Sequence, residues 1–160
     1  MAHTVKESAM YFESFEDIME YAINKEKDAE KFYNDAAEKE TFSGTKELFK
    51  GFALEERGHQ KMLENFSKEN FKHYKEKKIP DLKISDYTVE LEYKPNMSYD
   101  DILRLAAKRE EKAFKFYTDF AERADKESHK KVFKVLAQEE SKHKLKLETL
   151  LDDYLAAMGD

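Results

Sequence analysis

The feature that most constrains this chain is an internal duplication. Residues 14–66 align with residues 98–150 without a gap, and many of the paired positions are identical. The identical pairs include Ser14/Ser98, Asp17/Asp101, Ile18/Ile102, Ala22/Ala106, Glu26/Glu110, Ala29/Ala113, Phe32/Phe116, Tyr33/Tyr117, Phe49/Phe133, Ala53/Ala137, Glu56/Glu140, His59/His143 and Leu63/Leu147. So many coincidences at one offset predict two copies of one structural unit.

Each copy has the pattern of two amphipathic helices joined by a short turn. Apolar residues recur three and four positions apart along residues 15–36 and again along 99–120, which is a helical period rather than a strand alternation. Ser14 and Ser98 are N-cap candidates, each followed three residues later by an aspartate. With short turns expected at residues 41–44 and 125–128, each copy is predicted to be an antiparallel hairpin.

The predicted organisation is an N-terminal arm at residues 1–13, a hairpin at 14–78, a crossover at 79–97 and a second hairpin at 98–158. Pro80 ends the helical pattern, and residues 88–93 alternate as a short extended stretch does. Within the arm, Met10, Tyr11 and Phe12 are apolar enough to pack against the rest. The predicted fold is all-α, an antiparallel four-helix bundle with one long connection.

Composition narrows the class of function. Of the 160 residues, 40% are hydrophobic and 40% charged, with four Gly and two Pro, a profile typical of long helices around one core. The net charge is −6 with the two signs interspersed, which argues against nucleic acid as a partner. Without an apolar run of about 18 residues, the chain is expected to be cytoplasmic rather than bound to a membrane. Cysteine is absent, so any metal must be held by nitrogen and oxygen.

The strongest chemical signal is a Glu-x-x-His motif that occurs once in each copy. Glu56 precedes His59 by three residues, and Glu140 precedes His143 in the same way. At this spacing on a helix the carboxylate and the imidazole lie on one face and can reach a common metal ion. A single such pair is common by chance in a chain rich in glutamate. Two at equivalent repeat positions predict a metal site.

Two further glutamates interrupt the apolar stripe of the first helix in each copy. Glu26 lies between Ala22 and Ala29, and Glu110 occupies the equivalent position in the second copy. A carboxylate that faces a core is costly unless it is paired or bound to a cation, although a lysine salt bridge or a solvated stripe edge is the alternative. Four Glu and two His suit two divalent ions bridged by carboxylates, and this donor set favours iron or manganese over a structural zinc.

This pattern of ligands resembles the ferritin-like di-iron or di-manganese carboxylate superfamily. The stretches Ala22-x3-Glu26-x2-Ala29-x2-Phe32-Tyr33 and Ala53-x-Glu55-Glu56-x2-His59 are similar to the rubrerythrin branch, and the resemblance covers about residues 14–155. It implies two iron ions. The roles that it implies are terminal ligation by Glu26 and Glu110, bridging by Glu56 and Glu140, and binding of one ion each by His59 and His143.

Two departures from the rubrerythrin pattern alter the expectation. A typical rubrerythrin carries a rubredoxin domain with four cysteines, so here the electrons must come from an external carrier such as a rubredoxin-like protein. A typical rubrerythrin also has a glutamate where this chain has Ala113. The ligand exchange that this glutamate supports is not expected, so the site should be more symmetric, as in bacterioferritin.

Several other residues are candidates for supporting roles. Tyr33 and Tyr117 lie two turns beyond the glutamate ligands on the same face, so each is expected either to contact a ligand carboxylate or act in redox chemistry, or to be a core tyrosine. Glu55 and Glu139 lie four residues before the histidines and are either partners of the imidazole N–H or solvent-exposed.

The remaining candidates lack an equivalent in the other copy. Glu30, one turn beyond Glu26, is an extra carboxylate near the site or, more simply, a member of an inter-helix ion pair. His3, His73 and His129 have no motif partners and are expected at the surface.

The resulting functional hypothesis is a cytoplasmic, homodimeric di-iron oxidoreductase that reduces peroxide or dioxygen. The alternatives are a ferroxidase for iron storage or buffering, a manganese catalase-like enzyme or a hydroxylase with the same ligands, and a bundle without metal that binds a partner. The assembly discriminates among them, because storage requires a hollow shell. Metal content discriminates the last.

Overall fold

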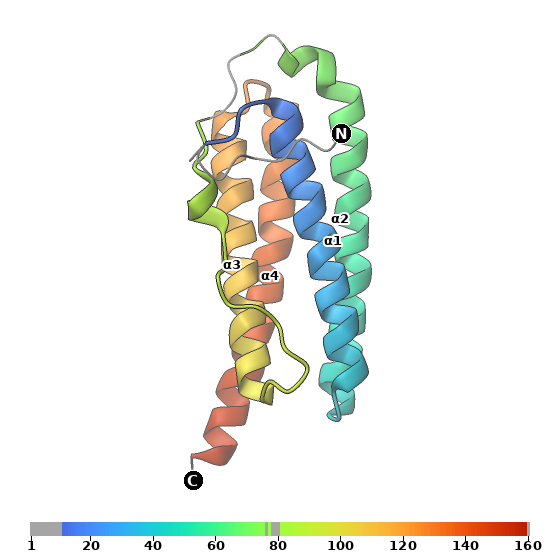
Figure 1. Cartoon of the computed structure of the whole chain (residues 1–160), viewed down its shortest axis with the longest axis vertical. Helices are drawn as coiled ribbons and strands as arrows, with labels where there is room; N and C mark the ends of the chain where they lie inside the picture. The colour runs from blue at the N-terminus through green and yellow to red at the C-terminus, as the bar shows by residue number, and fades with distance from the viewer. Residues whose placement is uncertain (1–10, 76, 78–80, 160) are drawn as a thin grey trace. The chain divides into compact units, whose positions relative to one another are not determined.

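The structure of the chain is a computed structural model that describes residues 11–75, 77 and 81–159. In this part of the chain there are four long helices and one short 3-10 helix, η1 (Figure 1). Their bounds are α1 Phe15–Lys39, α2 Ser43–Lys75, η1 Ile84–Tyr87, α3 Tyr99–Arg123 and α4 Glu127–Met158. Two compact units divide between Lys83 and Ile84. Each unit contains one helical hairpin, α1 with α2 or α3 with α4.

The helix starts follow the duplicated sequence. Ser14 caps α1 by accepting a hydrogen bond on Oγ from the backbone N–H of Asp17 at 3.1 Å. Ser98 caps α3 in the same way, with the N–H of Asp101 at 3.4 Å. Both predicted N-caps are therefore confirmed, and each satisfies one of the backbone donors left open at a helix start.

The turns within the hairpins are shorter than the predicted residues 41–44 and 125–128. Helix α2 already begins at Ser43 and α4 at Glu127, so only three residues separate the helices of each hairpin. In the first turn, the carboxylate of Glu40 accepts the backbone N–H groups of Thr41 at 2.9 Å and Phe42 at 3.1 Å. This side chain supplies the acceptors that a longer turn would otherwise have to provide from its own backbone.

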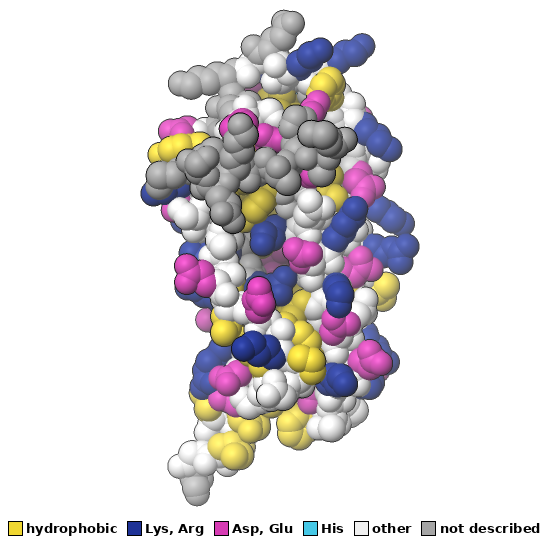
Figure 2. All heavy atoms as spheres, in the orientation of Figure 1, with side chains coloured by type: hydrophobic (Ala, Val, Ile, Leu, Met, Phe, Trp, Pro, Cys, Tyr) yellow, Lys and Arg dark blue, Asp and Glu magenta, His cyan; other side chains and the backbone are white. Residues whose placement is uncertain are grey.

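Each hairpin buries the apolar stripe that its sequence predicts. In the first unit the core residues include Ile18, Met19, Ala22, Phe32, Tyr33, Phe49, Phe52 and Leu63. In the second unit they include Leu103, Ala106, Phe116, Tyr117, Phe120, Phe133, Leu136 and Leu147. Charged side chains of both signs are interspersed on the face shown in Figure 2. None of the described helices is long and apolar enough to cross a bilayer.

The segments outside the hairpins differ in part from expectation. Residues 88–94 form no strand, because nothing in the described chain pairs with them, and the residues before them form η1 instead. Of the predicted arm, residues 1–10 lie outside the described residues. Phe12, at its end, is only 3% exposed and lies edge-on to Tyr21 at 5.0 Å between ring centroids. Its backbone N–H donates to the carbonyl oxygen of Leu82 at 3.4 Å.

The crossover is fixed to the second hairpin by Tyr87, and this contact gives a first prediction. Tyr87 Oη donates to Asp119 Oδ2 on α3 at 2.7 Å. Asp119 also pairs with Lys115 at 3.1 Å, so Y87F leaves the carboxylate with a partner. We therefore expect Y87F to lower the free energy of unfolding by only about 1 kcal/mol at pH 7, as measured by urea denaturation.

The effect of Y87F should depend on pH in a defined direction. Burial, and then the Asp119 carboxylate, raise the pKa of Tyr87 well above its usual value. An unfolded chain loses this proton at about pH 10, so the stabilising contribution is complete below that pH and is lost as the pH rises further. The difference between wild type and Y87F should shrink above about pH 10. An increase in that difference would contradict the assignment.

Candidate metal centre

In the first hairpin, the structure brings three of the predicted ligands together. Glu26 comes from α1, and Glu56 and His59 come from α2; they are 2%, 1% and 6% exposed. The Nδ1 atom of His59 lies 3.5 Å from Glu26 Oε2 and 3.4 Å from Glu56 Oε1. Two carboxylates and one imidazole therefore meet in a buried position between the two helices.

The second hairpin repeats this arrangement with Glu110 from α3 and Glu140 and His143 from α4. Their exposed fractions are 2%, 1% and 2%. The Nδ1 atom of His143 lies 3.4 Å from Glu110 Oε1 and 3.8 Å from Glu140 Oε1. We call the two sets the first and second triplets. The duplication of sequence is thus matched by a duplication of side-chain geometry.

The local sequence explains why the triplets form. Within α2 and α4, the Glu-x-x-His spacing puts both side chains on the helix face that packs on the partner helix. Small residues lie beside the ligands: Ala22 is one turn before Glu26, and Ala53 is one turn before Glu56, both almost fully buried. Their short side chains let the carboxylates approach the histidine without displacing the aromatic core.

The donor chemistry of each triplet fits a divalent metal ion. Two carboxylates buried in a low-dielectric interior are costly unless a positive charge lies between them. In each triplet one ligand atom per residue can be chosen so that all lie within 4.8 Å of one another, which is close to the separation across a metal ion with bonds of about 2.0–2.2 Å. Oxygen and imidazole ligands without sulfur suit iron or manganese.

The supporting candidates have mixed surroundings. Tyr33 and Tyr117 are 1% and 2% exposed and pack among aromatic rings, with Phe52 edge-on to Tyr33 at 5.3 Å. Glu55 is exposed, and Glu139 forms an ion pair with Lys142 at 3.9 Å. A role of these four residues in orienting ligands or in redox chemistry stays a prediction.

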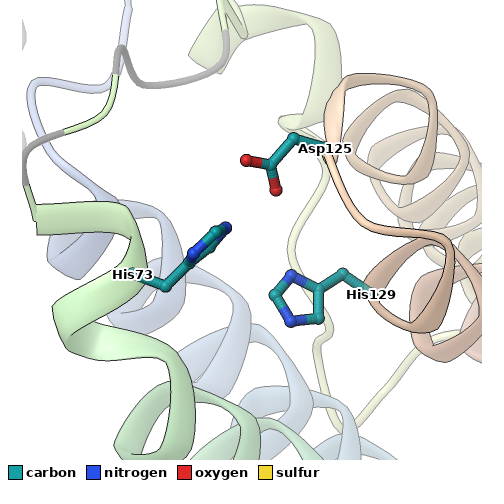
Figure 3. Close-up of side chains that lie close together, drawn as sticks. All are labelled: His73, Asp125 and His129. Carbon is teal, nitrogen blue, oxygen red and sulfur yellow. The ribbon is translucent and has the colours of Figure 1, made fainter.

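The histidines outside the motif correct one expectation. Figure 3 labels His73, in the last turn of α2, together with Asp125 and His129 at the start of α4. His73 is half-exposed, but His129 is only 6% exposed, so a surface position for His129 was wrong. Its repeat counterpart Thr45 is 4% exposed. This position lies one turn before a core phenylalanine in both copies and therefore faces the core. His3 lies outside the described residues.

Sequence reasoning missed the partner of Glu30. Instead of joining an ion pair in the described chain, Glu30 Oε1 accepts a hydrogen bond from Gln60 Nε2 at 2.7 Å. Gln60 is 8% exposed. The available signal was positional: Gln60 directly follows His59, and neither residue of this pair is repeated in the second hairpin.

The duplicated hairpins and their two triplets define a ferritin-like protein. The chain belongs to the rubrerythrin family, whose sequence model matches residues 17–151. No curated protein matches the chain closely enough to count as a relative.

Two solved structures are similar. One is described as a ferritin-like diiron-carboxylate protein from Thermotoga maritima; it has a TM-score of 0.76 and 20% identity over 91% of this chain and 99% of that one. The other, a hypothetical protein from Pyrococcus furiosus, has a TM-score of 0.65 and 27% identity over 84% of this chain and 86% of that one. The predicted fold class, an all-α ferritin-like four-helix bundle of duplicated hairpins, is confirmed.

Proposed function

We propose that this protein is a di-iron oxidoreductase that reduces peroxide or dioxygen with electrons from an external carrier. The observation that carries the proposal is the pair of matched, buried triplets, each with two carboxylates and one imidazole. Membership of the rubrerythrin family supports it. So does the similarity to a structure described as a ferritin-like diiron-carboxylate protein.

The proposed roles follow the duplication. Glu26 and Glu110 each bind one ion as terminal ligands, and His59 and His143 each contribute one nitrogen. Each triplet offers fewer ligands than iron usually takes, so we assign Glu56 and Glu140 as carboxylates shared by both ions, as the resemblance to the family implies. This assignment leaves each ion with open positions for an oxidant.

When bound, two ferrous ions supply together the two electrons that convert hydrogen peroxide and two protons into two waters. The chain supplies the surroundings for this reaction. Burial of the triplets keeps bulk water away from the carboxylates and strengthens their interaction with a cation. A separate reduced carrier must restore the two electrons, since the chain has no cysteine with which to hold an iron centre of its own.

The experiment that tests this function combines a spectrum with turnover. Protein loaded with ferrous iron is mixed with peroxide without oxygen, and oxidation of a reduced rubredoxin-like carrier is then followed. We expect peroxide-dependent oxidation of the carrier, reduced at least about 100-fold in the double variant H59A/H143A. An iron-loaded protein that neither changes colour nor consumes peroxide would contradict the proposal.

One observation favours a second candidate, a ferroxidase that stores or buffers iron. Ala113 and its counterpart Ala29 leave the two triplets alike, without the additional glutamate of a typical rubrerythrin. Light scattering and iron analysis separate the candidates. A dimer with two iron ions per chain supports the reductase, whereas a hollow shell with many ions per chain supports storage. Catalase activity specific to the manganese-loaded protein would support a manganese enzyme.

A further inference from the structure

The two hairpins match at the ligands but differ one helical turn away from them. In the first hairpin, the hydrogen bond between Glu30 and Gln60 connects α1 to α2. Glu30 lies one turn beyond Glu26, and Gln60 directly follows His59. The bond therefore joins the two helices immediately beside two ligands of the first triplet.

The second hairpin has a different pair at these positions. Phe114, the counterpart of Glu30, is 41% exposed and lines an open groove of about 330 Å3 between α3 and α4. Lys144, the counterpart of Gln60, instead pairs with Glu148 on its own helix at 3.7 Å. The helices of the second hairpin thus lack this polar connection beside the second triplet.

We propose that the Glu30–Gln60 hydrogen bond makes the two metal positions inequivalent. The ion in the first hairpin binds more tightly and exchanges more slowly than the ion in the second. This inference rests on the proposed function, because it requires two bound ions.

The first reason is positional. Gln60 is 8% exposed and Glu30 is half-buried, so the bond between them is shielded from competing water. A carboxylate acceptor makes it stronger than a bond between neutral groups. By holding α1 against α2, it fixes the separation of Glu26 and His59 before a metal arrives. Ligands that are already ordered lose less conformational entropy on binding.

The second reason is electrostatic. The amide of Gln60 is neutral, so the bond leaves the negative charge of Glu30 in place, one turn from the ligand carboxylate. Arg57 is the nearby cation on α2, but its side chain is exposed and its effect is screened by water. In the second hairpin Phe114 has no charge and Lys144 is positive. A cation is therefore favoured in the first hairpin over the second.

Stepwise titration of metal-free protein with Co²⁺ tests this inference, with calorimetry and the visible cobalt spectrum as readouts. Wild type should bind two ions in steps that differ by roughly tenfold or more. The variant H143A isolates the first position, and H59A isolates the second. Added to H143A, Q60A should weaken binding by roughly 10- to 100-fold. Added to H59A, it should change nothing.

Three further variants separate the two reasons. E30Q removes the charge and keeps a side chain of the same shape, whereas Q60A keeps the charge and removes the bond. F114A is the matched control in the second hairpin and should leave the tighter step unchanged. The reciprocal variant F114E/K144Q places the pair in the second hairpin and should bring the two steps closer together.

The outcomes also distinguish this inference from the proposed function. Two equal steps in wild type, or equal weakening of both positions by Q60A and E30Q, would overturn the inequivalence and leave the two-metal proposal intact. Failure of wild type to bind any Co²⁺, Mn²⁺ or Fe²⁺ would overturn the proposed function itself.

Discussion

In the variant E56Q we expect both metal ions to be lost, whereas E26Q should lose only one. The reason is the proposed sharing of Glu56 by both ions, in contrast to the terminal position of Glu26. Glutamine keeps the size of the side chain and removes its charge, so the 1% exposed position stays filled. Because loss of a mere partner of a ligand already costs 10- to 100-fold in metal affinity, loss of the shared ligand should cost at least about 100-fold. Metal analysis after dialysis measures the ions per chain.

The chain supplies a matched control for this prediction. E55Q makes the same change at the adjacent residue, which is exposed, and should keep two ions per chain. E140Q is the repeat equivalent of E56Q and should behave in the same way. If E56Q and E26Q lose the same single ion, Glu56 belongs to one ion only and the bridging assignment is wrong.

The second large effect concerns stability. A metal ion that binds only the folded chain stabilises it by about 2.7 kcal/mol at a concentration 100 times the Kd. For a chain of this size, each kcal/mol raises the melting temperature by about 2–4 °C. Addition of Mn²⁺ to metal-free protein should therefore raise the Tm by about 5–10 °C for each ion bound. Calorimetry over a series of Mn²⁺ concentrations measures this rise.

A control isolates the ligands from general effects of salt. In the double variant E56Q/E140Q, the same Mn²⁺ series should leave the Tm nearly unchanged. This variant should also be more stable than metal-free wild type, because it relieves repulsion among buried carboxylates. A wild-type Tm that does not depend on Mn²⁺ would show that the triplets hold no divalent ion in solution.

Much of the fold followed from the sequence because its determinants are local. The spacing of apolar residues defines each helix face, and Ser14 and Ser98 start their helices through contacts three residues away. The two triplets were partly accessible for the same reason. A Glu-x-x-His spacing on one helix places both groups together, and the repeat showed that Glu26 and Glu110 belong with them.

The features that sequence reasoning missed depend on contacts between distant segments. Nothing in the local pattern pairs Glu30 with a residue on α2, because that contact depends on the register of the two helices. The burial of His129 was missed because its partners in the core belong to the packed hairpin rather than to a motif. Residues 88–94 alternate in polarity, but a strand also needs a neighbour with which to pair.

The three-residue turns have a consequence for how the protein is made. They keep the members of each triplet close in sequence, so the contacts that form it are local and arise early in folding. A nascent chain emerges from the ribosome with its N-terminal part first. His59 is therefore translated well before α3 begins at Tyr99. Under the proposed function, the tighter of the two metal positions is the one whose ligands are all synthesised first, so iron loading can follow the order of translation.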